Sequence, residues 1–161
     1  MSSRLLQTQP SKAIAILRII AGLPLVMFGM MHLTGASPME PLVEAAGLPM
    51  PALTAIVAPI VQVLAGLMLL IGAGTRVGAT MGMIVSLGGL ITNLEIPNDQ
   101  WPTPSEADPS VIVMGTEPAF LTPLAITIIV LSAIVLFKGA GAWSLDHRCG
   151  GSPDPHEEDT L

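Results

Sequence analysis

The chain is poor in cysteine, aromatic residues and charge. Cys149 is the single cysteine among 161 residues, which excludes an intramolecular disulfide, a redox-active thiol pair and a metal site built on cysteines. Tyrosine is absent, and aromatic residues make up only 3% of the chain. Charged residues make up 11%, whereas soluble domains have about 25%. The composition therefore argues against a water-soluble domain.

Basic residues are few, and they are unevenly placed. Two of the three predicted loops between apolar segments contain no lysine or arginine at all. A nucleic-acid-binding protein would need a basic patch, so this function class is excluded. The six basic residues are Arg4, Lys12, Arg18, Arg76, Lys138 and Arg148.

Long apolar segments dominate what the sequence does contain. They cover residues 13–33, 52–73, 77–94 and 119–137, and each is close to the about 20 residues that a helix needs to cross a bilayer core. The last segment has only serine and threonine as polar interruptions, so it has no polar face for water. The sequence predicts an all-α fold, an integral membrane four-helix bundle in the lipid bilayer.

The distribution of charge predicts the orientation of this bundle. Short cytoplasmic loops are enriched in lysine and arginine, and all six basic residues fall in or beside segments on one side. We therefore expect both termini in the cytoplasm, a multi-pass protein of a bacterial cytoplasmic membrane, and a long outer loop over 95–117. The corresponding division is a cytoplasmic N-terminus (1–12), a membrane domain (13–146) and a disordered acidic tail (147–161).

Small residues recur at every fourth position in the third segment. Gly74, Gly78, Gly82 and Ser86 would line one stripe of a helix, where a neighbouring backbone can approach closely. We assign these four residues a structural role. The stripe fits a second helix of the same chain, and it also fits a second copy in a homo-oligomer.

Arg18 lies five residues beyond the start of the first apolar segment. Its long side chain could extend to the lipid headgroups and anchor the helix at the interface. Alternatively, it could pair with Asp146, which the predicted topology places at the same membrane face. Both interpretations give Arg18 and Asp146 a structural role.

Polar residues within the apolar segments are the candidates for ligand binding, because unpaired polar groups in hydrocarbon are costly. Gln62 lies near the predicted bilayer centre, while His32, Asn93 and Glu95 lie at the outer helix ends. Together they could line a cavity that opens outward beneath the 95–117 loop, with a quinone as the candidate ligand. The alternatives are a hydrogen bond between helices for Gln62 and helix capping for the other three.

Metal and haem sites find little support. The methionines beside His32 invite a copper hypothesis, but methionine is spread throughout the chain as apolar filler. A b-type haem would need two histidines at one depth, and the three histidines fall on different sides. We expect no metal and no covalently bound cofactor.

Three sequence segments resemble the DoxX family of small four-helix membrane proteins. The resemblance spans about residues 12–146, and its last segment is the most specific. Relative to the family pattern, His32 stands where lysine is usual and Gln62 where glutamate is usual. The segments are Leu17-Arg18 with Gly22 and Gly29-Met30-Met31-His32; Gln62 to Gly66 with Leu70, Gly72 and Thr75-Arg76; and Gly139, Gly141 and Ser144-Leu145-Asp146.

This resemblance implies a membrane subunit associated with redox complexes, including thiosulfate oxidation coupled to quinone reduction and responses to thiol stress. It also implies structural roles for Arg76 and Ser144. One hypothesis is a quinone-binding accessory subunit that receives electrons from a partner protein and is not catalytic alone; its catalytic residues stay unknown. The other is a non-catalytic membrane scaffold or assembly factor. Solute transport has less support, because no inverted repeat is evident.

Overall fold

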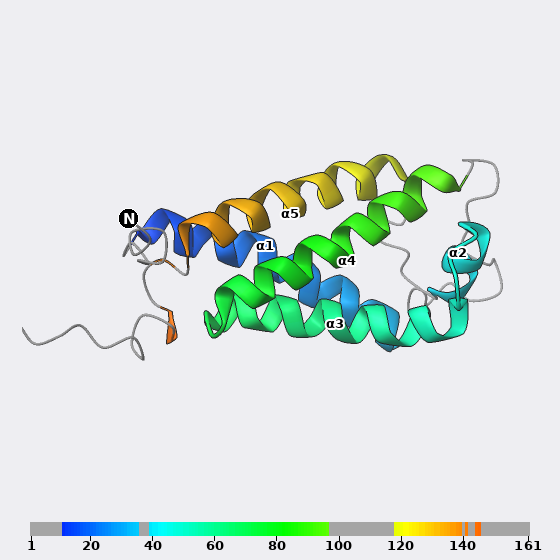
Figure 1. Ribbon diagram of the computed structural model, residues 1–161, viewed down its shortest axis with the longest axis horizontal. Coiled ribbons are helices and arrows are strands. Elements are labelled where there is room, and N and C mark those ends of the chain that lie inside the picture. Colours follow the sequence, from blue (N-terminus) through cyan, green and yellow to red (C-terminus); the bar gives the residue numbers. More distant parts are fainter. Residues whose placement is uncertain (1–10, 36–38, 97–117, 140, 142–143, 146–161) are drawn as a thin grey trace, which may run out of the picture.

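The computed structural model describes residues 11–35, 39–96, 118–139, 141 and 144–145, and within them the fold is all-helical (Figure 1). Four helices are long and apolar enough to cross a membrane. These confirm the four predicted segments to within two residues at each end. The helices are α1 (Lys12–Leu33), α2 (Glu40–Ala45), α3 (Pro51–Ile71), α4 (Thr75–Glu95) and α5 (Pro118–Lys138).

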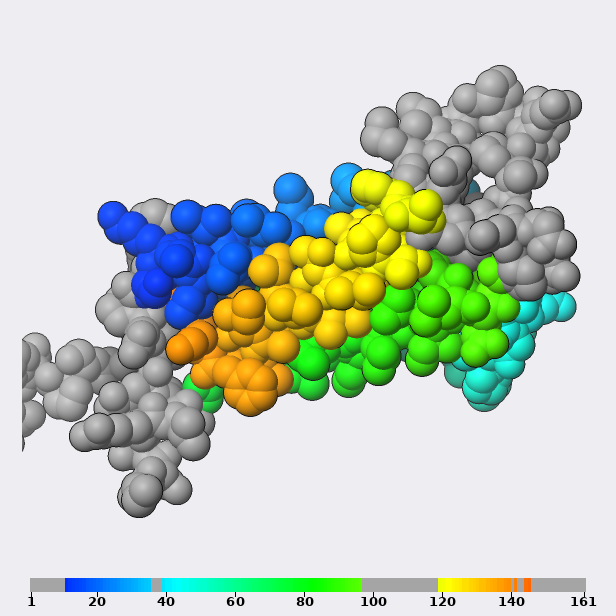
Figure 2. All heavy atoms as spheres, turned by 90° about the horizontal axis from the view of Figure 1, so that it is seen from above, coloured from blue at the N-terminus to red at the C-terminus, as the bar shows by residue number. Residues whose placement is uncertain are grey.

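The four long helices form a closed ring. The most extensive contacts join α1 to α3 and α4 to α5, and the ring is completed by contacts of α3 with α4 and of α1 with α5. Figure 2 shows α5 lying across the face between α1 and α4. Each long helix is 21 or 22 residues, which corresponds to about 32 Å and matches a bilayer core.

Large apolar side chains cover the outside of the ring. Leu23 is 60% exposed, Ile84 64% and Phe137 78%, and similar residues occur on all four long helices. In water such a surface would drive aggregation, whereas in lipid it needs no cover. The protein is therefore an integral, multi-pass membrane protein.

The two ends of the ring differ in charge. All four basic residues among the described ones (Lys12, Arg18, Arg76 and Lys138) lie on the turns at the end where α1 begins, α4 begins and α5 ends. The described acidic residues, Glu40, Glu44 and Glu95, lie at the opposite end. We call these the basic end and the acidic end.

The turn from α3 to α4 at the basic end requires glycine. Gly72 has φ +76° and Gly74 has φ +59°, in the left-handed region that other residues adopt only with strain. The Gly72 N–H donates to the Met68 carbonyl at 2.8 Å, which ends α3. The chain therefore reverses within three residues, and α3 and α4 become antiparallel neighbours.

The half of the ring nearer the basic end is tightly packed. Its core consists of small and branched apolar side chains from all four long helices, and most of them are fully buried. The core residues are Ala21, Leu25, Ala65, Leu69, Ala79, Ile128 and Val135. Leu25 and Ile128 are the two that lie nearest the acidic end along their helices.

Glycines allow the closest helix contact in the packed half. A Cβ on Gly66 of α3 would lie 2.8 Å from the Gly22 carbonyl oxygen of α1, and a Cβ on Gly22 would lie 2.9 Å from the Gly66 carbonyl oxygen. Real Cβ atoms do not approach backbone this closely. The α1–α3 contact therefore depends on both glycines, a pairing that the sequence alone did not predict.

The predicted small-residue stripe of α4 packs within the chain. A Cβ on Gly78 would lie 2.8 Å from the Met68 Cβ of α3, and one on Gly82 would lie 3.0 Å from Leu25 Cδ1 of α1. Ser86 is buried at 7% exposure. Of the two partners considered for this stripe, the structure provides the helices of the same chain.

Arg18 is buried at 2% exposure, so the interface-anchor interpretation is wrong. Its guanidinium lies against Gly72, and a Cβ on Gly72 would also lie 2.7 Å from Ser144 Cβ. Gly141 sits on the first turn of α1, where an added Cβ would lie 3.0 Å from the Ala15 nitrogen. Two described residues after α5 thus return to the ring, Gly141 to the first turn of α1 and Ser144 to Gly72 beside Arg18. Asp146 lies outside the described residues, so its pairing with Arg18 stays a prediction.

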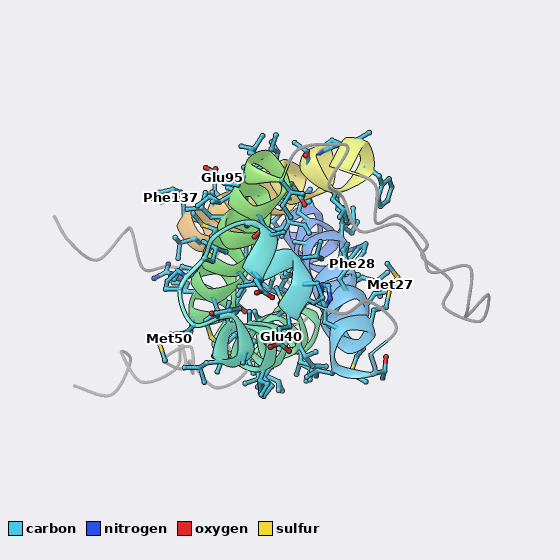
Figure 3. The ribbon with its side chains drawn as sticks, turned by 90° about the vertical axis from the view of Figure 1, so that its right-hand side faces the viewer. Met27, Phe28, Glu40, Met50, Glu95 and Phe137 are labelled. Atoms are coloured by element: carbon cyan, nitrogen blue, oxygen red, sulfur yellow. The ribbon has the colours of Figure 1, made fainter. Side chains whose placement is uncertain are left out.

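Helix α2 was not predicted, and it lies at the acidic end. Figure 3 views the molecule from this end and shows α2 in front of the four-helix ring. Pro41 stands in its first turn, where proline favours helix initiation. Val43 is 1% exposed, whereas Glu40 and Glu44 are exposed. The predicted N-terminal segment before Ser11, the loop from 97 to 117 and the acidic tail lie outside the described residues.

Candidate ligand cavity

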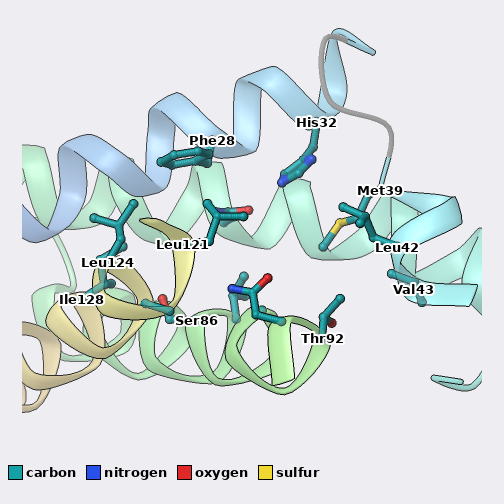
Figure 4. A pocket seen from close by; sticks show the side chains of 15 residues that line it. Phe28, His32, Met39, Leu42, Val43, Ser86, Thr92, Leu121, Leu124 and Ile128 are labelled. Atoms are coloured by element: carbon teal, nitrogen blue, oxygen red, sulfur yellow. The ribbon is translucent and has the colours of Figure 1, made fainter. Parts of the chain in front are cut away.

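A cavity of about 110 Å³ lies inside the ring, in the half nearer the acidic end. All five helices contribute to its wall, and most lining side chains are apolar. Figure 4 shows Phe28 and His32 of α1 across the space from Ser86 and Thr92 of α4, with Leu121 and Leu124 of α5 beside them. The volume is comparable with the about 150 Å³ of an apolar protein cavity that binds benzene.

Three of the four candidate binding residues line this cavity. His32 comes from the last turn of α1, Gln62 from the middle of α3 and Asn93 from the last turn of α4, and all three are partly buried. Glu95 is exposed at the end of α4 and does not line the cavity. The structure therefore groups two amides and one imidazole and leaves the carboxylate outside.

The side-chain amides of Gln62 and Asn93 can still donate and accept hydrogen bonds. Neither side chain makes a hydrogen bond with another residue in the described part of the chain. Within the described residues Gln62 therefore forms no hydrogen-bonding link between helices. An amide without a partner in an apolar environment costs about 1–3 kcal/mol, so a cavity ligand or water would stabilise the pair.

The polar groups are spread over the depth of the cavity. Gln62 lies eleven residues after Pro51, the first residue of α3, which is about 17 Å below the acidic end. His32 and Asn93 lie within two residues of the acidic ends of their helices. A ligand could therefore meet one hydrogen-bond donor at the bilayer centre and two near its mouth.

Two polar residues of the wall were missed as candidates. Ser86, which the sequence placed in the packing stripe, lines the cavity from α4. Thr92 also lines it, but its hydroxyl donates to the Gly88 carbonyl of its own helix at 3.0 Å. Ser86 lies seven residues before Asn93, a helical spacing that could have placed it on the same side of α4. Thr92 directly precedes Asn93, and its spacing to Asn93 gives no such signal.

The short helix α2 closes part of the cavity mouth. Met39, Leu42 and Val43 contribute apolar side chains to the wall, while the glutamates of α2 stay outside it. The sequence predicted that the 95–117 loop would cover this opening. Residues 97–117 lie outside the described part, and the cover that is described comes from the first connection instead.

No metal-binding cluster occurs among the described residues. They contain no group of three or more His, Cys, Asp or Glu side chains that could hold an ion. The cavity contributes a single imidazole and two amides, a set that suits hydrogen bonding to a neutral ligand better than coordination of a cation.

The comparison with protein-family models identifies the chain. The DoxX family model matches residues 13–93, which is half of the 161 residues and includes α1 to α4 up to Asn93. The chain belongs to the DoxX family. Among the residues that carried the resemblance, Arg18, His32, Gln62 and Gly72 fall inside the match. The segment from Gly139 to Asp146 falls outside it.

No curated protein and no solved structure matches this DoxX protein. The family is linked to redox-related membrane functions. The family assignment therefore supports a membrane role of this kind, and the cavity suggests which ligand it would involve.

Proposed function

We propose that this DoxX protein is a quinone-binding subunit of a membrane redox complex. The observation that carries the proposal is the cavity itself, an apolar space in the lipid-embedded part of the ring with unsatisfied amides on its wall. A quinone head group is a flat apolar ring with two carbonyl oxygens that accept hydrogen bonds. The amide N–H groups of Gln62 and Asn93 could donate to them.

In this proposal the chain binds and orients the quinone, and a partner protein supplies the electrons. Reduction of a quinone to a quinol takes two electrons and two protons. The single Cys149 provides no dithiol that could act as an electron donor. His32 lies at the mouth of the cavity, where an imidazole could pass protons to the ring. The quinone is then an exchangeable ligand and the chain an accessory subunit.

Replacing Gln62 with leucine is expected to weaken quinone binding about twofold to twelvefold, because one hydrogen bond to the ligand contributes about 0.5–1.5 kcal/mol. The measurement is a titration of the purified protein with a ubiquinone or menaquinone analogue. Thr127→Val is a matched control, because Thr127 faces lipid on α5 and its hydroxyl donates to the Pro123 carbonyl of its own helix. Absence of saturable binding to the wild-type protein would refute the proposal.

We further propose that the acidic end faces away from the cytoplasm of a bacterial cell. The charge difference between the two ends supports this orientation, because basic residues are retained on the cytoplasmic side. A partner protein that delivers electrons through the cavity mouth would then dock on the outer face.

A cysteine introduced at position 44 should report this orientation. Glu44 is exposed at the acidic end, so Glu44→Cys in a Cys149→Ser background is expected to react with a membrane-impermeant maleimide in intact cells. The protein with its native Cys149 should react only after the membrane is permeabilised. The reverse pattern would place the acidic end in the cytoplasm.

The scaffold alternative was based on the small-residue stripe and on two cytoplasmic ends, and the structure bears only on the stripe. It used the stripe of Gly78 and Gly82 as a surface for a partner, but these residues contact α3 and α1 of the same chain. Bulky residues at both positions would disturb the ring itself. They would therefore not distinguish a scaffold from a ligand-binding subunit.

A further inference from the structure

An apolar groove opens on the lipid-facing side of the ring between α3 and α4. It has a volume of about 360 Å³ and lies along residues 53–61 of α3 and 84–92 of α4. Its outer rim consists of exposed apolar side chains, including Leu53 at 50%, Val57 at 46% and Ile84 at 64% exposure. In the membrane this rim is in contact with hydrocarbon chains.

The groove and the cavity adjoin each other. Five residues line both, namely Met39, Val43, Val85, Gly89 and Thr92. Gly89 stands at this junction, and a Cβ added to it would meet no atom within 4 Å. Gly88 lines the groove but not the cavity, and a Cβ added to it would also meet no atom within 4 Å. Two consecutive residues without side chains thus leave open space beside the cavity wall.

These two glycines differ from the others in the long helices. Gly22, Gly66, Gly78 and Gly82 are crowded by neighbouring helices, so close packing explains the absence of a side chain there. No packing contact explains Gly88 and Gly89. Their lack of side chains leaves open space at the surface of α4.

The chemistry of the groove restricts its occupant to hydrocarbon. Its two polar side chains are Thr54 and Thr92, and each hydroxyl already donates to a backbone carbonyl, Thr54 to Pro49 at 3.2 Å and Thr92 to Gly88 at 3.0 Å. No side-chain donor is left for a polar ligand. The cavity, in contrast, carries the unsatisfied amides and has space for about one ring.

We infer that the α3–α4 groove holds the hydrocarbon chain of the quinone whose head group occupies the cavity, and that Gly88 and Gly89 form the passage between them. This inference rests on the proposed function. It adds that the ligand enters sideways from the bilayer and that a chain-bearing, lipid-soluble quinone is the substrate class. A water-soluble quinone would leave the groove unused.

The inference is tested by measuring where the hydrocarbon chain of the quinone lies, because the binding affinity hardly depends on the groove. Lipid tails are as apolar as leucine side chains, so a chain gains little by moving from the bilayer into the groove. A decyl quinone with a photoreactive group at the end of its chain, added to the full-length protein in lipid nanodiscs, reports where the chain lies. Labelled peptides are mapped by mass spectrometry, and a chainless ubiquinone head group is titrated in parallel.

Labelling is expected to concentrate on α3 and α4 beside the groove and to disappear with excess unlabelled decyl quinone. Gly88→Leu should fill the groove and lose this labelling while the chainless head group still binds. Thr127→Leu, on the lipid-facing side of α5, should leave the labelling unchanged.

Two other outcomes separate this inference from the proposed function. If the head group binds saturably but labelling spreads over all lipid-facing helices, the groove inference is wrong and the proposed function stands. If neither quinone binds saturably, both are wrong. Should Gly88→Leu fail to fold, the labelling pattern of the wild-type protein still decides between these outcomes.

Discussion

Gly72→Ala is expected to lower the free energy of unfolding by about 2–5 kcal/mol, because two penalties combine: about 1–2 kcal/mol for a Cβ in the left-handed conformation and about 1–3 kcal/mol for overpacking. Gly72 has φ +76°, and the added Cβ would overlap the Arg18 guanidinium and lie 2.7 Å from Ser144 Cβ. The measurement is the midpoint of unfolding by SDS in mixed micelles, followed by circular dichroism.

Gly47→Ala provides the matched control for this substitution. Gly47 also has a positive φ, +64°, but no atom lies within 4 Å of an added Cβ. It should therefore lose only the about 1–2 kcal/mol of backbone strain. Equal effects at both positions would contradict the interpretation that Gly72 is needed to make room for Arg18.

Gly66→Leu is expected to separate α1 from α3 and to cost at least about 3 kcal/mol, the upper end of what overpacking usually costs. The added Cβ would lie 2.6 Å from Val26 Cγ2 and 2.8 Å from two backbone atoms, the Gly22 carbonyl oxygen and the Val26 nitrogen. The side chain of Val26 could turn away, but the backbone atoms are fixed in α1. They can move only if the helices move. The same SDS unfolding measurement, together with the yield of monodisperse protein from membranes, tests this.

Gly88→Leu is the control for Gly66→Leu. It adds a leucine to a long helix at a position with open space, so it should leave the unfolding midpoint near that of the wild type. A comparable loss at Gly88 would mean that any bulky residue in these helices is harmful. The Gly22–Gly66 contact would then have no special role.

The long helices were predictable because each is a nearly continuous apolar run of sufficient length, which lipid demands regardless of tertiary contacts. Helix α2 was not, because its six residues are too few to show a helical period. The Gly22–Gly66 contact joins two different helices, and nothing in a single sequence indicates which glycines of two helices face each other.

The sequence predicted how deep each candidate residue lies along its helix, and the site was predictable to that extent. His32, Gln62 and Asn93 are the polar residues within the apolar segments, and the ring brings them to one cavity. Glu95 has a similar depth but is exposed, because depth along a helix does not determine the direction of a side chain around the helix axis. The burial of Arg18 was not predictable, because Gly72 and Ser144, which lie near its guanidinium, come from distant parts of the chain.

The contrast between the packed and the open half of the ring determines from which side of the membrane protons and electrons can reach a bound ligand. From Gln62 to Ile71, the last residue of α3, the chain advances nine residues, or about 14 Å, through interlocked side chains such as Leu25 and Leu69. Among the described residues, the cavity is therefore separated from the basic end by the packed core. We expect traffic of protons and electrons only through the acidic mouth, and the membrane to stay electrically tight while the ligand turns over.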